Sequence, residues 1–111
     1  MKAAILDTSF IMTSVKQKID FFSWLEDEGI KALVPNLVIK ELKGLKADLA
    51  LKIMEKNKFQ TINFKGKNTD KEIIDYAKAN PRIIVATLDR EIKKVRNQKL
   101  IIRQTKKLEV I

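Results

Sequence analysis

The chain has 111 residues, which is enough for one domain with a single core and too short for a separate substrate domain. It contains neither cysteine nor histidine, which excludes disulfides, thiolate zinc sites and Ser-His or Cys-His nucleophile pairs, so any catalysis must rely on carboxylates, with help from a metal. The net charge of +9 points to a polyanionic partner, with solubilising lysines on helix faces as the alternative explanation.

Apolar runs and apolar periodicity predict strands that alternate with helices. Short runs rich in β-branched residues predict buried strands at residues 3–6, 32–34, 61–64, 83–86 and 100–102. Helical spacing of apolar residues predicts helices at residues 16–28, 36–45, 48–56, 69–79 and 89–95. This order predicts one α/β domain over residues 1–111, in which a central, mainly parallel sheet is flanked by helices on both faces.

The apolar runs also bear on where the protein works. Every run is far too short to cross a bilayer, so we expect a soluble protein with no membrane partner. Asp7 interrupts the N-terminal apolar segment, which argues against a secretory leader and favours the cytoplasm.

Two aspartates directly follow predicted strands. Asp7 lies in "AAILDTSFI", directly after the first strand, and Asp89 lies in "IIVATLDREIKK", separated from the fourth strand only by Thr87 and Leu88. Sites in α/β sheets form beyond the carboxyl ends of the strands, where both residues are expected to lie. Asp also caps helices, so Asp89 could cap a helix near Arg90 and Asp7 a short turn at residues 8–10. The sequence leaves both interpretations open.

The acids on predicted helices separate into two kinds. Most have a Lys three or four positions away and are expected to form solvated surface pairs: Asp48, Glu55, Asp75 and Glu91. Glu41 has only apolar residues or glycine at those positions, so it lies in or beside the apolar stripe without a helical ion partner. Such a carboxylate either pairs with a cation elsewhere in the fold or binds a metal.

Asp70 begins the predicted helix at residues 69–79. The segment "NTDKEII" reads as a capping box in which Thr69 caps and Glu72 reaches back, which leaves the Asp70 side chain free. Interaction with the helix dipole and metal binding both explain an acid at this position.

Four carboxylates therefore remain as candidate catalytic and metal-binding residues: Asp7, Glu41, Asp70 and Asp89. Hard oxygen ligands of this kind suit Mg²⁺ or Mn²⁺, which also bind phosphates. Such an ion activates water and stabilises charge on a phosphodiester under attack.

Four segments resemble one family of enzymes. Along the whole chain and in the same order, "ILDTSFI", "VIKELKGLK", "TDKEIIDYA" and "VATLDREIKK" look like the PIN-domain metal-dependent ribonucleases. The segments "LDTSFIMTSVKQKID" and "ATLDREIKKVR" are most similar to archaeal relatives of the small-ribosomal-subunit processome nuclease, which acts on precursor ribosomal RNA in eukaryotes. Those relatives often carry a second aspartate where this chain has Lys71, so the resemblance leaves one or two bound ions open.

The resemblance implies roles for further residues. The acids at positions 7, 41, 70 and 89 would surround the ion or ions, with Thr87 and Ser9 supporting the site. Apart from the resemblance, six cations on predicted helices that begin near these acids are assigned to RNA phosphates, with a solvated face as the alternative: Lys40, Lys43, Lys46, Lys93, Lys94 and Arg96.

Taken together, we expect a Mg²⁺- or Mn²⁺-dependent endoribonuclease that acts in ribosomal RNA processing. One alternative is a ribonuclease toxin of a toxin-antitoxin pair, and another is a catalytically inactive protein that binds RNA or a ribosome-assembly partner. The expected partners are RNA and either ribosome-assembly proteins or an antitoxin, with a homodimer as a further option.

Overall fold

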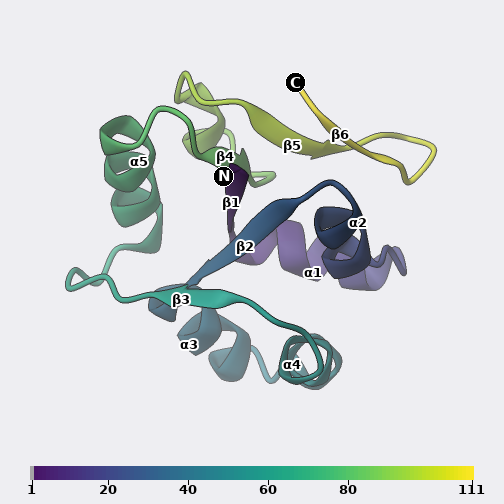
Figure 1. The fold of residues 1–111 in the computed structure, drawn as a ribbon. Coiled ribbons are helices and arrows are strands. Elements are labelled where there is room, and N and C mark those ends of the chain that lie inside the picture. Colours follow the sequence, from purple (N-terminus) through teal and green to yellow (C-terminus); the bar gives the residue numbers. More distant parts are fainter. Residues whose placement is uncertain (1) are drawn as a thin grey trace.

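A six-stranded sheet organises the fold, with the strand order β3-β2-β1-β4-β5-β6 (Figure 1). The computed structural model describes residues 2–111. The strands are β1 (Lys2–Leu6), β2 (Ile30–Pro35), β3 (Gln60–Ile62), β4 (Ile84–Ala86), β5 (Lys99–Ile102) and β6 (Leu108–Val110). The first five are parallel, and β6 pairs with β5 in the antiparallel direction.

Helices cover both faces of this sheet, which confirms the predicted fold class. They are α1 (Thr8–Lys16), α2 (Phe21–Asp27), α3 (Asn36–Gly44), α4 (Asp48–Glu55) and α5 (Thr69–Ala79), with a single turn of 3₁₀-helix, η1 (Ile92–Lys94). In Figure 1, α5 lies on one side of the strands and α1 with α2 on the other. No described helix is both long enough and apolar enough to span a bilayer.

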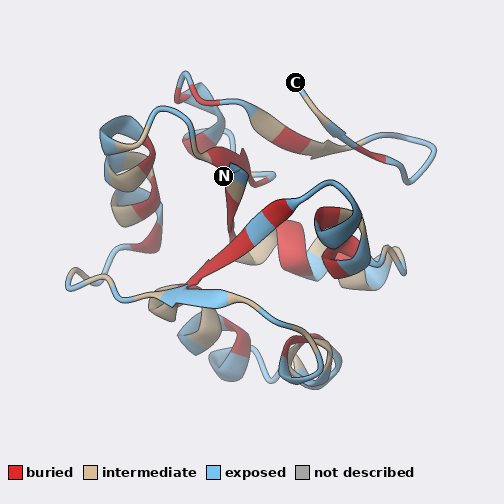
Figure 2. Cartoon of the chain, in the orientation of Figure 1, coloured by how far each residue is buried: buried red, intermediate tan, exposed pale blue. Residues whose placement is uncertain are grey.

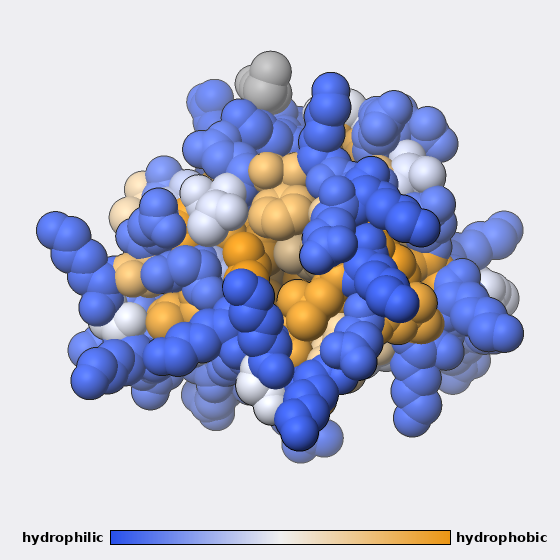
Figure 3. Space-filling model, turned by 90° about the horizontal axis from the view of Figure 1, so that it is seen from below, coloured by the Kyte–Doolittle hydropathy of each residue, from blue (hydrophilic) through white to orange (hydrophobic). Residues whose placement is uncertain are grey.

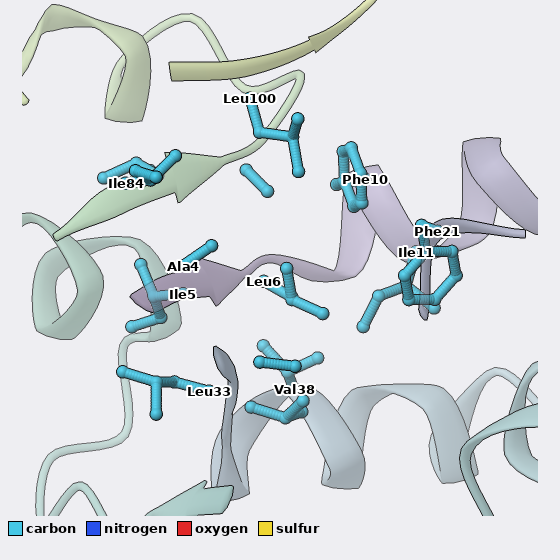
Figure 4. Packing of buried hydrophobic residues seen from close by; sticks show 14 of the residues in the cluster. Ala4, Ile5, Leu6, Phe10, Ile11, Phe21, Leu33, Val38, Ile84 and Leu100 are labelled. Carbon is cyan, nitrogen blue, oxygen red and sulfur yellow. The ribbon is translucent and has the colours of Figure 1, made fainter. Parts of the chain in front are cut away.

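The central strand β1 ends in the core of the domain. It lies between β2 and β4, and its residues Ala4, Ile5 and Leu6 are fully buried. Figure 4 shows Phe10 and Phe21 beside the end of this strand, and Figure 2 shows burial decreasing outward to the exposed edge strand β3. A parallel strand covered on both faces needs apolar side chains in both directions, which explains the continuous run "AAIL".

The prediction of one helix over residues 16–28 is wrong. A helix that the sequence suggested only as a short turn, α1, already begins at Thr8 and ends at Lys16, and a second helix, α2, begins at Phe21. Between them Lys18 adopts a left-handed backbone with φ of 60°. Asp20 then caps α2 by accepting a hydrogen bond from the Ser23 N–H. The apolar spacing continues across this turn, so periodicity alone did not reveal it.

Two other predictions differ from the structure near the C-terminal part of the sheet. The helix expected over residues 89–95 is only the turn η1. The edge strand β6 was not predicted, because its three residues give too short a pattern. This strand forms by pairing with β5, and the sequence of the three residues alone does not indicate that pairing.

The strand order creates a switch point beside β1. From β1 the chain proceeds outward to β2 and β3, and it then returns to β4 on the other side of β1. In open α/β sheets, ligands bind in the crevice beyond the carboxyl ends of the strands at such a point. Asp7 follows β1 and Asp89 follows β4, so these two acids lie on either side of the crevice.

Ser14 provides a test of the packing around α1. The residue is fully buried, and its hydroxyl oxygen has no hydrogen-bond partner among the described residues. Because an unsatisfied buried hydroxyl is destabilising and Ala favours helix, Ser14→Ala should raise the free energy of unfolding by about 0.5–1.5 kcal/mol. Urea denaturation measures this change.

The control is Ser23→Ala in α2, where the hydroxyl donates to Asp20 at 2.9 Å. This variant gains the same helix propensity but loses a hydrogen bond, so its stability should change less. A loss of stability in Ser14→Ala would show that the hydroxyl has a partner.

Candidate metal centre and its relatives

Four acidic residues from four different parts of the chain line one open cavity. Asp7 precedes α1, Glu41 lies in α3, Asp70 lies in the first turn of α5, and Asp89 precedes η1. The cavity has a volume of about 580 Å³. The fold therefore brings together the four residues that the sequence predicts as metal ligands.

Asp7 occupies the N-cap position of α1, but its side chain makes no capping hydrogen bond. Its Oδ2 atom instead accepts hydrogen bonds from Ser9 Oγ at 2.8 Å and from Thr87 Oγ1 at 2.7 Å. The residue is 5% exposed. Within residues 2–111, Oδ1 receives no hydrogen bond. The cap interpretation is thus wrong for the Asp7 side chain, and one oxygen remains available at a cavity-lining residue.

Asp89 combines both interpretations that the sequence left open. Its Oδ1 atom accepts hydrogen bonds from the N–H groups of Glu91 at 2.8 Å and Ile92 at 3.2 Å, so it caps η1. Its own N–H donates to Thr87 Oγ1 at 3.0 Å. The capping bonds use one carboxylate oxygen, and the residue still lines the acidic cavity.

Glu41 is held by hydroxyl groups rather than by a cation. Oε1 accepts a hydrogen bond from Thr8 Oγ1, and Oε2 accepts one from Thr69 Oγ1 at 3.1 Å. The residue is exposed, and none of the ion pairs found among residues 2–111 includes it. Thr8 and Thr69 were not predicted as site residues, although each is adjacent in sequence to a predicted acid.

The start of α5 differs from the predicted capping box. Asn68, not Thr69, is the N-cap, and its side chain accepts a hydrogen bond from the Lys71 N–H at 3.0 Å. Thr69 is instead the first helical residue and is turned toward Glu41. Asp70 becomes the second helical residue, and its side chain remains free of capping bonds, as expected.

A reciprocal contact places the start of α5 beside α3. The Asn36 side chain donates to the Phe64 carbonyl at 3.2 Å and accepts from the Phe64 N–H at 2.9 Å. This pair of bonds ties the segment between β3 and α5 to the first residue of α3. It therefore helps to set where Asp70 lies relative to Glu41.

The charges of the cluster act on one another at Asp70. Its pKa is raised above the ordinary value of 3.8, first by partial burial and then by the negative charges of Asp89, Asp7 and Glu41. A side-chain hydrogen bond with Asp89, which requires one carboxyl to be protonated, acts in the same direction. Asp70 is exposed overall, so solvent still screens its repulsion by the other three acids.

The donor set fits a hard divalent cation in its chemistry. All four acids offer oxygen, and Mg²⁺ usually binds one or two carboxylates and keeps several waters. Within residues 2–111, however, no three acidic side chains lie close enough together to hold an ion jointly. An ion at this cavity would therefore depend on water ligands or on side-chain movement.

Comparison with known families identifies the fold. The family model described as "PIN like domain" matches residues 4–106. The chain belongs to this family of PIN-like domains. The match spans both sides of the switch point and all four acids, as the resemblance of the sequence segments implied.

Solved structures agree with this assignment. The PIN-like domain is similar to the structure described as "Structure of the PIN domain endonuclease Utp24", with a TM-score of 0.81 and 25% sequence identity. The similarity covers 97% of this chain and 90% of that chain. Comparison with curated protein sequences finds no match. Together, the family model and the structural match support membership of the PIN-domain nuclease family.

Apolar residues contribute to the lining of the acidic cavity of the PIN-like domain, and exposed lysines are close in sequence to Glu41. Met12 and Leu45 line it, and Leu45 and Leu49 are 62% and 61% exposed. Figure 3 views the molecule from below the orientation of Figure 1 and shows apolar surface in the middle of the face that it draws, with hydrophilic side chains around it. Lys40 and Lys43, both exposed, flank Glu41 on α3.

The six cations assigned to RNA do not form one group. Lys46 follows α3 rather than lying on it. The helix predicted to carry Lys93, Lys94 and Arg96 is only the turn η1, and Arg96 lies beyond its end. Lys94 and Arg96 line a different cavity, and Lys94 forms an ion pair with Glu91 at 3.2 Å. Of the surface pairs expected at helical spacing, only this one forms among residues 2–111.

The raised pKa of Asp70 predicts a gain in stability when its charge is removed. Above the folded-state pKa, the charged carboxylate destabilises the metal-free protein, because burial and three like charges outweigh the favourable helix dipole. Asp70→Asn should therefore unfold with a free energy higher by up to about 1 kcal/mol at pH 7 in EDTA. The gain should shrink as the pH falls toward 3.8, where the wild-type carboxyl becomes protonated.

Glu72→Gln is the matched control, because Glu72 lies in the same helical turn. It loses the favourable dipole interaction without relieving the cluster, so its stability should be unchanged or slightly lower. Denaturation series at several pH values measure both variants. A loss of stability in Asp70→Asn at pH 7 would contradict the electrostatic account of the cavity.

Proposed function

We propose that this PIN-like domain is a Mg²⁺- or Mn²⁺-dependent endoribonuclease that hydrolyses RNA phosphodiester bonds. The observation that carries the proposal is the convergence of Asp7, Glu41, Asp70 and Asp89 on one cavity at the switch point of the sheet. These acids come from distant parts of the sequence. Capping explains one oxygen of Asp89 and leaves the other three side chains without a helix-capping role.

Hydroxyl residues would hold the carboxylates in position for a bound ion. Ser9 and Thr87 hold Asp7, so its second oxygen has a defined position from which to bind a cation. Thr8 and Thr69 orient Glu41 from two sides. A bound Mg²⁺ or Mn²⁺ would supply an activated water and neutralise charge on the phosphate.

Basic residues close in sequence to the cavity-lining residues of α3 would bring the substrate to these acids. Lys40 and Lys43 are exposed on the helix that carries Glu41, and Lys46 follows directly after two cavity-lining residues. Cations at such positions attract the RNA backbone and offset its repulsion by the acids.

The proposed target is ribosomal RNA, and the proposed setting is its processing in the cytoplasm. The support comes from the sequence segments that resemble archaeal relatives of the processome nuclease and from the similarity to the endonuclease Utp24. Ribosome-assembly proteins are accordingly the proposed protein partners.

A second candidate function is RNA binding without cleavage. The observation that favours it is that no three described acidic side chains lie close enough to hold an ion jointly. Lys71 directly follows Asp70 in sequence, and a positive residue at this position also disfavours a second ion.

Metal binding can be tested independently of cleavage. An ion that binds only the folded state stabilises it by mass action, so Mn²⁺ at ten times its Kd should contribute about 1.4 kcal/mol. For a domain of this size, that corresponds to a rise in Tm of about 5–10 °C. Calorimetry with and without Mn²⁺ measures the shift, and an unchanged Tm across millimolar Mn²⁺ would count against the metal site.

Cleavage itself is tested with Asp7→Asn. The variant keeps the shape of the side chain but removes a charge that a cation needs, so Mn²⁺-dependent cleavage of a labelled RNA should fall by at least about 100-fold. Asp75→Asn is the control, because Asp75 is exposed on α5 and forms no ion pair within residues 2–111. Full activity in purified Asp7→Asn would exclude the proposed role of this carboxylate.

A further inference from the structure

A second cavity gathers cations at the opposite end of α5 from Asp70. We call it the basic cavity: it has a volume of about 500 Å³ and is lined by Ala77, Lys78, Pro81, Lys94, Val95, Arg96 and Asn97. Its three cationic residues are all exposed. Arg82 lines an adjoining cavity that shares Pro81. Four cations therefore surround one small region, whereas the acidic cavity has no cationic residue in its lining.

The wall of the basic cavity is held in place by a buried amide. Asn97 is 7% exposed, and its Nδ2 atom donates to the carbonyls of Ala77, Asn80 and Ile83 at 2.9–3.0 Å. These bonds join the end of α5 to the segment between η1 and β5, and Figure 1 shows the two side by side. The basic residues thus project from a backbone that does not need to be ordered by a ligand.

The local charge is strongly positive even after ion pairing. Glu91 contacts Lys94 at 3.2 Å, but the two side chains are 70% and 72% exposed, so solvent weakens this pair. Lys78 and Arg96 form no ion pair among residues 2–111. A ligand with several negative charges can therefore bind without first breaking a buried salt bridge.

The basic cavity and the acidic cavity lie within reach of one short strand of RNA. Lys78 is eight residues beyond Asp70 on α5, which corresponds to about 12 Å along the helix axis. At about 3.4 Å or more per nucleotide, at most about four nucleotides span that distance. A guanidinium and two ammonium groups are also the usual protein partners of phosphate.

We propose that the basic cavity is a second phosphate-binding site, which holds the RNA strand where it continues beyond the acidic cavity. The inference rests on the proposed function for the identity of the strand, but binding at the basic cavity does not require cleavage. Lys94 and Arg96 thereby act on phosphates about four nucleotides away from the acids rather than beside them.

The test measures binding in EDTA, so that its result does not depend on nuclease activity. The variant Lys78→Gln/Lys94→Gln/Arg96→Gln should bind a uridine 12-mer at least about tenfold more weakly than the wild type in fluorescence anisotropy. Because the variant lacks three cations that would each neutralise a phosphate, the slope of log affinity against log salt should decrease by about 2. In a separate NMR titration with Mg²⁺ in place of EDTA, a uridine trinucleotide should bind at the acidic cavity of this variant with the same affinity as in the wild type.

The control variant, Lys31→Gln/Lys58→Gln/Lys107→Gln, removes the same charge from exposed positions outside both cavities. It should bind the 12-mer nearly as well as the wild type. An equal loss of affinity for the 12-mer in both triple variants would mean that only net charge matters, and it would overturn the site. The site would also be overturned if the first triple variant lost as much affinity for the trinucleotide as for the 12-mer. Preferential binding of a hexaglutamate peptide would also overturn it, because the cavity would then recognise acidic protein.

Circular dichroism melting separates these outcomes from misfolding. All six substituted residues are exposed, so both variants should melt within a few degrees of the wild type. If the wild type binds the 12-mer as expected but never cleaves RNA, the nuclease proposal fails and the basic cavity stands. If cleavage occurs and the first triple variant binds the 12-mer normally, the basic cavity fails alone.

Discussion

The architecture of the site depends on a nearly buried carboxylate, that of Asp7. Removing a charge from water costs several kcal/mol, and no cation among residues 2–111 pairs with Asp7. Hydroxyl groups from Ser9 and Thr87 offset this cost by donating to the same oxygen. The two hydroxyls also accept hydrogen bonds from the N–H groups of Leu88 and Asp89, respectively. One network therefore joins the segments that follow β1 and β4, so the acids on either side of the switch point have a common support.

The same chemistry recurs at Glu41 and joins the helices. Thr8 at the start of α1 and Thr69 at the start of α5 donate to opposite oxygens of this carboxylate. Neutral donors leave the negative charge intact, whereas a lysine in the same place would neutralise it. Partial burial and the negative charges of Asp89, Asp7 and Glu41 raise the pKa of Asp70, so the charged form of Asp70 costs stability in the metal-free domain. Such a cost is typical of functional sites, where activity rather than stability determines the residues.

The distribution of charge complements this acidic centre. The chain carries +9 overall, yet its acids converge on one cavity and its cations lie outside that cavity's lining. A polyanion is therefore attracted by the domain as a whole and repelled locally, unless a cation screens the acids. Exposed lysines lie on α3, and the basic cavity lies at the opposite end of α5 from Asp70, so the exposed cations are spread over more than one part of the domain.

The sequence alone determined the fold class and the identity of the four acids. Short apolar runs bounded by polar residues, such as residues 3–6, are typical of buried strands, and Glu41 stands out because its helical neighbours include no cation. These signals are local, since they depend on spacings of one to four residues. The resemblance to PIN-domain nucleases rested on the same short segments, and the family model confirmed it.

Only the tertiary structure decided how the side chains of those acids are used. The Asp7 side chain accepts a hydrogen bond from Thr87, 80 residues away in the chain, and makes no capping bond, whereas Asp89 caps the N–H groups of Glu91 and Ile92 just beyond it. Only the folded structure shows that Thr8 and Thr69 donate to Glu41 and that β6 pairs with β5. It also shows that Lys94 and Arg96 line a cavity other than the acidic one. Local sequence records which bonds a side chain is able to make, and the packing of distant segments selects which of them form.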